Sequence, residues 1–255
     1  MNIAYKNGGK MRNIRLTIEY DGKDFNGWQK QPTKLNIQGT IEQAIKQITG
    51  EEVQLNASGR TDAGVHAFGQ VANFKTNSQI PIEKFAIAIN SRLKRSIVIK
   101  KAEEVDERFH SRLNCKKKTY RYIINNSPEG TAIYRNLETH IPQKLDVEKM
   151  KKAVKYFEGE HDFKAFKASG TSSKSSVRTI YKAEVYKEGD RVFIELTGNG
   201  FLYNMVRIIA GTLVDVGIGK IKPDEIPEII KMQKRENAGK TLPPNGLYLL
   251  RVMYE

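Results

Sequence analysis

The sequence contains one cysteine, Cys115, among its 255 residues. A single cysteine excludes an intrachain disulfide, and therefore a disulfide-stapled secreted fold, and favours a reducing compartment. Long apolar runs are also missing, because polar residues interrupt the most apolar stretch, residues 201–219, which falls far short of the ~18 residues that a membrane span needs. Residues 1–11 contain no apolar core of a secretory signal. We therefore expect a cytoplasmic protein that does not enter the membrane.

Recognisable cofactor motifs are scarce as well. The four histidines are scattered, and one cysteine cannot complete a ligand cluster with them, so no metal site is predicted. Residues 239–241 (Gly-Lys-Thr) end like a phosphate-binding loop, but Lys234 stands where the first glycine belongs. No G-x-G-x-x-G sequence follows an expected strand. An enzyme with this sequence is expected to use its own side chains.

Positive charge is in excess. The chain has 43 Lys and Arg against 29 Asp and Glu, a formal net charge of +14. Such an excess indicates a polyanionic partner, with nucleic acid first and an anionic membrane surface second. A surface that is merely well solvated is the alternative, and charge alone does not separate RNA from DNA.

Hydrophobic periodicity predicts an α+β chain. Alternation over residues 14–20 predicts a strand, and a helical period predicts a helix over residues 37–48, with Asn36 as its N-cap and Gly50 as its stop. Further strands are expected at 53–55, 70–74 and 97–99, with a helix at 82–93. A similar succession follows Lys116, with strands at 119–124, 181–186, 191–197 and 248–253, and helices after Asp146 and over 202–214. This order suggests a pseudo-repeat.

One segment between two expected strands, residues 58–67, concentrates chemically useful residues. Gly59 and Gly64 bracket Asp62, which has Arg60 and His66 nearby. Glycine allows the backbone to approach a ligand closely, and a carboxylate near a guanidinium group stays ionised and oriented. An Arg-x-Asp sequence in a loop is more often a surface ion pair, so this segment alone leaves both interpretations open.

The run Gly59-Arg60-Thr61-Asp62-Ala63-Gly64-Val65-His66-Ala67 resembles the active-site motif of the tRNA pseudouridine synthase A family. Other segments match the family in the same order, along almost the whole chain from Met11. They are Tyr20-Asp21-Gly22 with Phe25 and Gly27-Trp28-Gln29, Phe109-His110-Ser111-Arg112, Lys118-Thr119-Tyr120-Arg121-Tyr122, the run from Gly198 to Arg207, and Pro243-Pro244-Asn245-Gly246-Leu247. Chance agreement at so many separated places is implausible.

The resemblance implies an α+β fold. It consists of two similarly built halves that form a joined, mainly antiparallel sheet flanked by helices, with the active cleft between the halves. Residues 11–115 are then the N-terminal half with the catalytic Asp loop, and residues 116–255 the C-terminal half with a base-stacking Tyr and an Arg partner. Residues 1–10 are an extra N-terminal segment without a family counterpart, so Met11 competes with Met1 as the native start.

The resemblance also implies an isomerase. Family members convert uridine to pseudouridine at positions 38 to 40 in the tRNA anticodon stem-loop, without a metal or an organic cofactor, as homodimers in which one tRNA contacts both subunits. Asp62 is the implied catalytic carboxylate. Whether it attacks C1′, attacks C6 or removes a proton from C2′ stays open.

Three further residues receive implied or favoured roles. Tyr120 matches the position whose ring stacks on the target base, although strand alternation alone favours a core role. Arg207 matches the basic partner of the catalytic aspartate, and an arginine in an apolar helix needs an acidic neighbour in any case. For Arg60 we favour a phosphate contact near the extruded nucleotide over bracing of the loop. His66 and His110 are expected to pack or hydrogen-bond rather than to transfer protons.

The chain departs from the family at Leu93-Lys94-Arg95-Ser96-Ile97, where the family often has Leu-Pro-x-Asp-Ile before a strand. We expect a local change of turn and charge there, away from the motif loop. Two other functional classes fit the sequence less well. A non-catalytic RNA-binding module shares the charge but gives no reason for Asp62 between two glycines, and a methyltransferase or deaminase needs the nucleotide loop or metal cluster that the sequence lacks.

Overall fold

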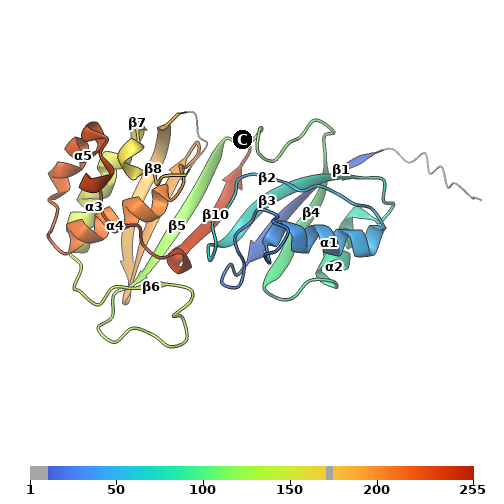
Figure 1. Ribbon diagram of the computed structural model, residues 1–255, viewed down its shortest axis with the longest axis horizontal. Helices are drawn as coiled ribbons and strands as arrows, with labels where there is room; N and C mark the ends of the chain where they lie inside the picture. The colour runs from blue at the N-terminus through green and yellow to red at the C-terminus, as the bar shows by residue number, and fades with distance from the viewer. Residues whose placement is uncertain (1–10, 171–174) are drawn as a thin grey trace, which may run out of the picture. The chain divides into compact units, whose positions relative to one another are not determined.

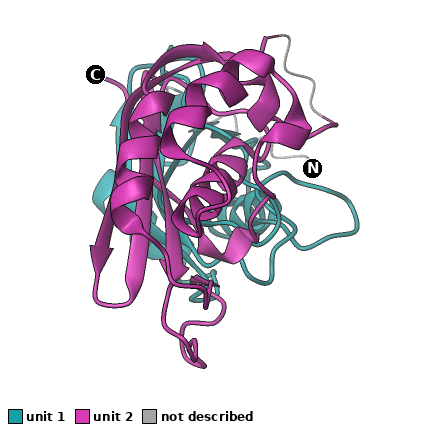
Figure 2. Cartoon of the chain, turned by 90° about the vertical axis from the view of Figure 1, so that its left-hand side faces the viewer, with its two compact units in different colours: residues 1–115 teal, residues 116–255 magenta. Residues whose placement is uncertain are grey.

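A computed structural model describes residues 11–170 and 175–255, and the expected N-terminal segment 1–10 lies outside the described residues. The chain divides into two units, residues 1–115 and residues 116–255 (Figure 2). Among the described residues, no helix has both the length and the apolar character needed to cross a membrane.

The first unit is a sheet covered by two helices (Figure 1). Its elements are β1 (Arg12–Tyr20), α1 (Ile37–Thr49), β2 (Asn56–Ala57), β3 (His66–Thr76), α2 (Ile82–Asn90) and β4 (Ile97–Val105). The middle strand, β1, is antiparallel to both β3 and β4, and β2 adds to β3, so the order is β4-β1-β3-β2. Ile14 and Phe74 face each other across β1 and β3, and the Phe74 ring lies 6.1 Å from that of Phe85 in α2. Helix α2 therefore covers this apolar face.

Helix α1 begins and ends where the sequence predicts. The Asn36 side chain accepts a hydrogen bond of 2.8 Å from the Gly39 amide, and Gly50 ends the helix at φ 75°. Ile37, Ile41 and Ile45 are fully buried on one side of the helix. The cap, the stop and the apolar period thus agree, which is why this helix was predictable from local sequence alone.

The second unit repeats this arrangement with additions (Figure 1). Its strands and α-helices are β5 (Lys117–Asn125), β6 (Thr139–His140), α3 (Val147–Val154), β7 (Gly159–Asp162), β8 (Val177–Glu188), β9 (Arg191–Gly198), α4 (Met205–Gly217), α5 (Ile226–Met232) and β10 (Leu247–Met253). The strand order is β10-β5-β9-β8-β7, all antiparallel, and the short β6 runs parallel to β5. Helices α3 and α4 pack against each other, and α3 also contacts β8.

The two units share one strand order. In each, the first strand lies between the last strand and the strand that precedes the second helix: β4-β1-β3-β2 in one unit and β10-β5-β9-β8 in the other. The structure therefore confirms the α+β class, the two similarly built halves and the mainly antiparallel pairing within each half.

Several sequence-based boundaries are wrong, and the structure explains three of them. The strand expected at 53–55 is absent, because the Leu55 amide donates to Glu42 of α1 instead of to a strand, and pairing starts at β2. The helix expected at 82–93 ends at Asn90. The helix expected from residue 202 begins at Met205, because Asn204 has the left-handed backbone conformation at φ 60°. Strands β6 and β7 and helix α5 were not predicted.

Candidate active site

Asp62 lies in the loop that connects β2 to β3, and its side chain is half-buried. The neighbouring Thr61 and Val65 are buried, so the loop is anchored on both sides of the carboxylate. Arg60 is exposed and, within the described part of the chain, forms no hydrogen bond or ion pair. The interpretation of Arg60 and Asp62 as a surface ion pair is therefore wrong, and the Arg60 guanidinium is available to a ligand.

The backbone of the loop is held by the segment that follows β1. The Trp28 amide donates to the Thr61 carbonyl at 3.0 Å, and the Gly64 amide donates to the Phe25 carbonyl at 3.3 Å. These two bonds flank Asp62. Backbone hydrogen bonds to a buried segment restrict the loop far more than side-chain contacts at the surface do, so the carboxylate is presented from a fixed position.

Two glycines make this close approach possible. Gly27 has φ 81°, and a Cβ atom there would lie 2.6 Å from the Thr61 carbonyl oxygen. A Cβ atom on Gly22 would collide with the Val65 carbonyl oxygen. Both glycines belong to the segments that resemble the family, and the structure gives the physical reason: any side chain at either position would push the Asp62 loop away.

Buried polar side chains of the sheet hold the Asp62 loop by hydrogen bonds. The Tyr20 hydroxyl and Thr61 Oγ1 are 2.8 Å apart, and Gln70 Nε2 donates to the Gly59 carbonyl at 2.9 Å. Ser58 Oγ donates to Gln70 Oε1 at 2.7 Å. Burial raises the pKa of Tyr20, so its hydroxyl stays neutral at physiological pH. The support is thus a hydrogen-bonded network that carries no added charge.

The two histidines of the matching segments have structural contacts. His66, 1% exposed, has its Nδ1 atom 3.1 Å from the Gly22 amide nitrogen and 3.1 Å from Asp21 Oδ1. His110 Nδ1 accepts a hydrogen bond of 3.1 Å from the Arg112 amide. Both rings therefore order backbone turns, which confirms the expectation that they hydrogen-bond.

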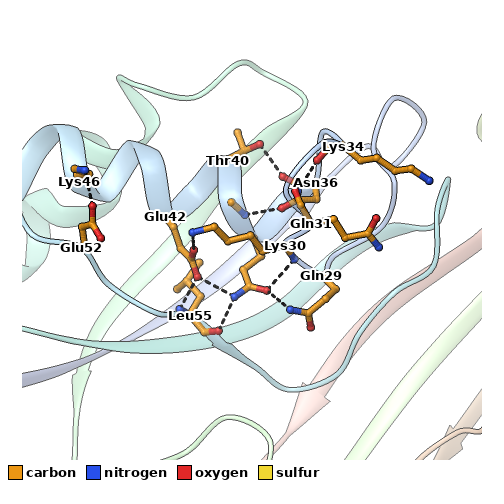
Figure 3. A network of polar contacts seen from close by, with 12 residues as sticks. Gln29, Lys30, Gln31, Lys34, Asn36, Thr40, Glu42, Lys46, Glu52 and Leu55 are labelled. Atoms are coloured by element: carbon orange, nitrogen blue, oxygen red, sulfur yellow. Dashed lines mark hydrogen bonds and ion pairs between the residues drawn. The ribbon is translucent and has the colours of Figure 1, made fainter. Parts of the chain in front are cut away.

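The segment that supports the Asp62 loop is itself tied to α1 (Figure 3). Gln29 Nε2 and the Lys30 amide both donate to Gln38 Oε1, at 3.1 and 3.2 Å. Gln38 then donates to Glu42, which is buried and also accepts from the Leu55 amide at 3.0 Å. Glu42 Oε2 lies 2.9 Å from Lys30 Nζ, and this bond raises the pKa of Lys30. One buried carboxylate thus joins three chain segments.

Tyr120 lies on β5 in the second unit, and it is 8% exposed. Its ring makes an edge-to-face contact with the Phe201 ring, with centroids 5.1 Å apart. Phe201 precedes helix α4, so the contact joins the strand to the start of that helix. An edge-to-face neighbour fixes the plane of the ring.

Arg207 lies in the first turn of α4. Its Nε donates to the Leu242 carbonyl at 2.7 Å, and its Nη1 donates to Asn204 Oδ1 at 2.6 Å. A cation at the N-terminus of a helix opposes the helix dipole, so helix stability does not explain its presence. The two hydrogen bonds orient the guanidinium plane.

The segment after Leu242 is fixed to β5. The Tyr122 hydroxyl donates to the Pro243 carbonyl at 2.7 Å, and a Cβ atom on Gly246 would lie 2.7 Å from the Ile123 carbonyl oxygen. The carbonyl that orients Arg207 is therefore held by the strand that carries Tyr120. Neither Leu242 nor Gln70 was singled out from the sequence, because a backbone acceptor and a cross-strand amide leave no recognisable pattern.

No group of three or more His, Cys, Asp or Glu side chains in residues 11–170 and 175–255 is arranged to hold a metal ion.

The residues named from the sequence as site residues fall into two sets. Arg60 and Asp62 share one loop of the first unit, and Tyr120 and Arg207 are joined in the second unit through residues 201–204.

A family model described as tRNA pseudouridine synthase matches residues 16–114 and 153–255, which include Asp62 and Arg207. The chain therefore belongs to the tRNA pseudouridine synthase family, whose members are isomerases. Within that family, the chain is similar to curated proteins named tRNA pseudouridine synthase A. It is 55% identical to the one from Caldicellulosiruptor saccharolyticus and 54% identical to the one from Acetivibrio thermocellus. Each alignment spans 244 residues, 96% of this chain and 100% of the relative.

Proposed function

We propose that this chain isomerises uridine to pseudouridine at positions 38 to 40 in the anticodon stem-loop of tRNA. The observation that carries the proposal is the presentation of Asp62, a half-buried carboxylate on a loop held by backbone bonds on both sides. Similarity over the whole length of relatives named tRNA pseudouridine synthase A supports the substrate class.

All atoms of uridine are accounted for in the isomerisation. The N1–C1′ glycosidic bond breaks, the uracil turns, a C5–C1′ bond forms, and the C5 proton is released while N1 gains a proton. Substrate and product are isomers, so no oxidant or group donor is consumed. The protein must therefore supply a nucleophile or base, a surface that holds the detached uracil, and contacts that keep the nucleotide extruded.

Each of the four site residues is assigned one of these tasks. Asp62 is the catalytic carboxylate, and Arg207 is its basic partner, oriented by Asn204 and the Leu242 carbonyl. The Tyr120 ring stacks on the target uracil, which holds the base without fixing its rotation. Arg60, exposed and without a partner among the described residues, contacts phosphate.

In this proposal, each of the two units contributes different functional groups. The first unit supplies the carboxylate loop, and the second supplies the ring and the cation. We further propose a cytoplasmic homodimer in which one tRNA contacts both subunits, because a tRNA extends well beyond a 29.0 kDa body and the chain carries a net charge of +14. A complex of two chains and tRNA, measured by light scattering during gel filtration, tests the stoichiometry.

The activity is tested by mapping pseudouridine in unmodified tRNA transcripts after incubation with the protein and no added cofactor. We expect pseudouridine wherever a uridine occupies position 38, 39 or 40, and no product at a position changed to cytidine. S-adenosylmethionine should have no effect. Product at other positions contradicts the assigned site. Binding without any product favours the non-catalytic RNA-binding module.

A further inference from the structure

A cluster of cations that have no protein partner among the described residues lies between α2 and β4. Arg92, Lys94 and Arg95 are exposed, and within the described residues their side chains form no hydrogen bond or ion pair. We call residues 92–95 the basic turn. Its backbone is nevertheless ordered, because the Ile97 amide donates to the Lys94 carbonyl at 3.0 Å and the Leu93 amide donates to the Asn90 carbonyl at 3.2 Å.

Cations in two other basic stretches do have carboxylate partners. On α3, Lys151 lies 2.7 Å from Glu148 and Lys149 also has a carboxylate partner, as does Lys155 directly after the helix. Arg121, in one of the matching segments, lies 2.6 Å from Glu195. Cations that already have a carboxylate partner gain less from phosphate than cations in water. The basic turn is therefore better placed to attract a polyanion than the lysines of α3.

The basic turn and the Asp62 loop are each followed by a strand, and these two strands begin at the same end of the sheet. Tyr20, the last residue of β1, is paired with Ala67 on one side and with Ile97 on the other. Ala67 follows the motif loop and Ile97 follows the basic turn. Two strand spacings separate them, roughly 10 Å. The segment that departs from the family thus lies two strands away from the motif loop at this end of the sheet, and the Asp21 amide, which follows β1, donates to the Ser96 carbonyl at 3.0 Å.

The carboxylates beside the basic turn do not cancel its charge. Asp21 and Asp24 are exposed after β1, with the cation Lys23 between them, and Asp21 Oδ1 already accepts from the Lys23 amide and lies beside His66. Within the two described segments 21–24 and 92–95, four exposed cations, three of them in the basic turn, thus stand against two exposed carboxylates. These two segments therefore carry a net positive charge at the end of the sheet where the Asp62 loop joins β3.

We propose that the basic turn contacts phosphates of the RNA strand whose uridine reaches Asp62, and that it supplies part of the tRNA affinity of this chain. The inference rests on the proposed function. The strands that follow the motif loop and the basic turn begin roughly 10 Å apart, about the rise of three nucleotides along one strand of a duplex, and we therefore place the contacted phosphates within a few nucleotides of the target. The departure from the family at Lys94 and Arg95 then adds phosphate contacts and does not change the chemistry.

The test compares two triple variants that remove the same charge. One is Arg92→Gln/Lys94→Gln/Arg95→Gln, and the matched control is Lys149→Gln/Lys151→Gln/Lys155→Gln on and directly after α3, where each lysine has a carboxylate partner. Binding of unmodified tRNA is measured at several KCl concentrations between about 50 and 200 mM. We expect the basic-turn variant to bind roughly 10-fold more weakly, with a salt slope smaller by about 0.9 for each phosphate that is no longer neutralised. The control should stay within about twofold of wild type.

Single-turnover pseudouridine formation with saturating enzyme separates binding from chemistry. The basic-turn variant should reach the wild-type rate once it is saturated, and its thermal midpoint should match that of wild type because the changed side chains are exposed. Charge reversal, Lys94→Glu/Arg95→Glu, should weaken binding further than neutralisation.

Two outcomes overturn the inference alone. They are an active wild-type protein whose basic-turn variants bind tRNA as tightly as it does, and a loss of affinity in the α3 control as large as that in the basic-turn variant. A wild-type protein that forms no pseudouridine overturns the proposed function instead. The two failures are thus distinguished in one series of measurements.

Discussion

Asn204 Oδ1 accepts a hydrogen bond of 2.6 Å from Arg207 Nη1, and Asn204 itself has φ 60° and ψ 6° immediately before α4. The left-handed conformation is costly for residues with a side chain, and Asn is among the few that adopt it. It places the Asn204 side chain beside the first helical turn, where it meets the guanidinium. The unusual backbone conformation of Asn204 therefore allows its side chain to orient the Arg207 guanidinium.

The first prediction concerns this pair. Asn204→Gly keeps the left-handed backbone but removes the acceptor, so we expect kcat to fall roughly 10-fold because a hydrogen bond to a charged group disappears. The thermal midpoint should fall only slightly, since glycine adopts this conformation without strain and this offsets part of the lost hydrogen bond. Asn204→Asp retains an acceptor and should recover most of the rate. A glycine variant with wild-type kcat contradicts the positioning role.

The second prediction uses two glycines with similar backbone angles. Gly27→Ala and Gly50→Ala both place a Cβ atom at positive φ, at 81° and 75°. Gly50 has open space around it, whereas Gly27 faces the Thr61 carbonyl. We expect Gly50→Ala to cost about 1 kcal/mol of unfolding free energy with normal activity. Gly27→Ala should cost roughly 2 kcal/mol or more and should also lower kcat, because the Asp62 loop must move.

Chemical denaturation and steady-state kinetics on the same preparations measure both effects. Equal activity losses in the two glycine variants would show that the backbone strain, rather than the contact with the loop, is responsible. Normal kcat in Gly27→Ala would show that the position of the loop tolerates displacement.

The third prediction concerns the support beneath the loop. Tyr20→Phe removes the hydroxyl that lies 2.8 Å from Thr61 Oγ1 at a buried position. We expect a loss of about 1–2 kcal/mol in unfolding free energy and a lower kcat with little change in KM. In a double-mutant cycle with Thr61→Val, the coupling energy should be about 1 kcal/mol. Additive effects of the two changes would mean that the two hydroxyls do not support each other.

The fourth prediction is a pH dependence of stability. Burial, followed by a hydrogen bond to Glu195, raises the pKa of Tyr186 from its ordinary 10.0 to about 12. The folded state thus holds this proton more tightly than the unfolded state, so the contribution to stability is present below pH 10 and is lost between pH 10 and 12. The thermal midpoint of wild type should fall more steeply over that range than that of Tyr186→Phe.

Comparison with the phenylalanine variant is essential for that measurement, because the chain has 11 tyrosines and other buried ones contribute to the same decline. Parallel curves for the two proteins between pH 10 and 12 would contradict the raised pKa of Tyr186.

Local features of the fold were predictable from the sequence, and contacts between distant segments were not. Helix α1 was located correctly because Asn36, the apolar period and Gly50 all act within the helix or directly at its ends. The strand near residue 55 was misplaced because Glu42, in the preceding helix, captures the Leu55 amide. The start of α4 was missed because nothing short of the structure shows Asn204 at positive φ.

The same distinction applies to the candidate site. The resemblance identified Asp62, and the structure explains the glycines in the neighbouring matching segment as room for its loop. The support from Gln70 depends on the register of β3 beneath the loop, and the orientation of Arg207 depends on the Leu242 carbonyl. Such contacts between segments distant in sequence are created by folding and carry no sequence pattern of their own.

The most direct test of the central claim is tritium release from tRNA labelled at uridine C5, because formation of the C5–C1′ bond expels that hydrogen. Wild type is compared with Asp62→Asn, which keeps the size of the side chain but removes its charge. We expect release by wild type and none by Asp62→Asn, with tRNA affinity preserved in the variant. Release by Asp62→Asn at the wild-type rate would contradict the assignment of Asp62 as the catalytic carboxylate.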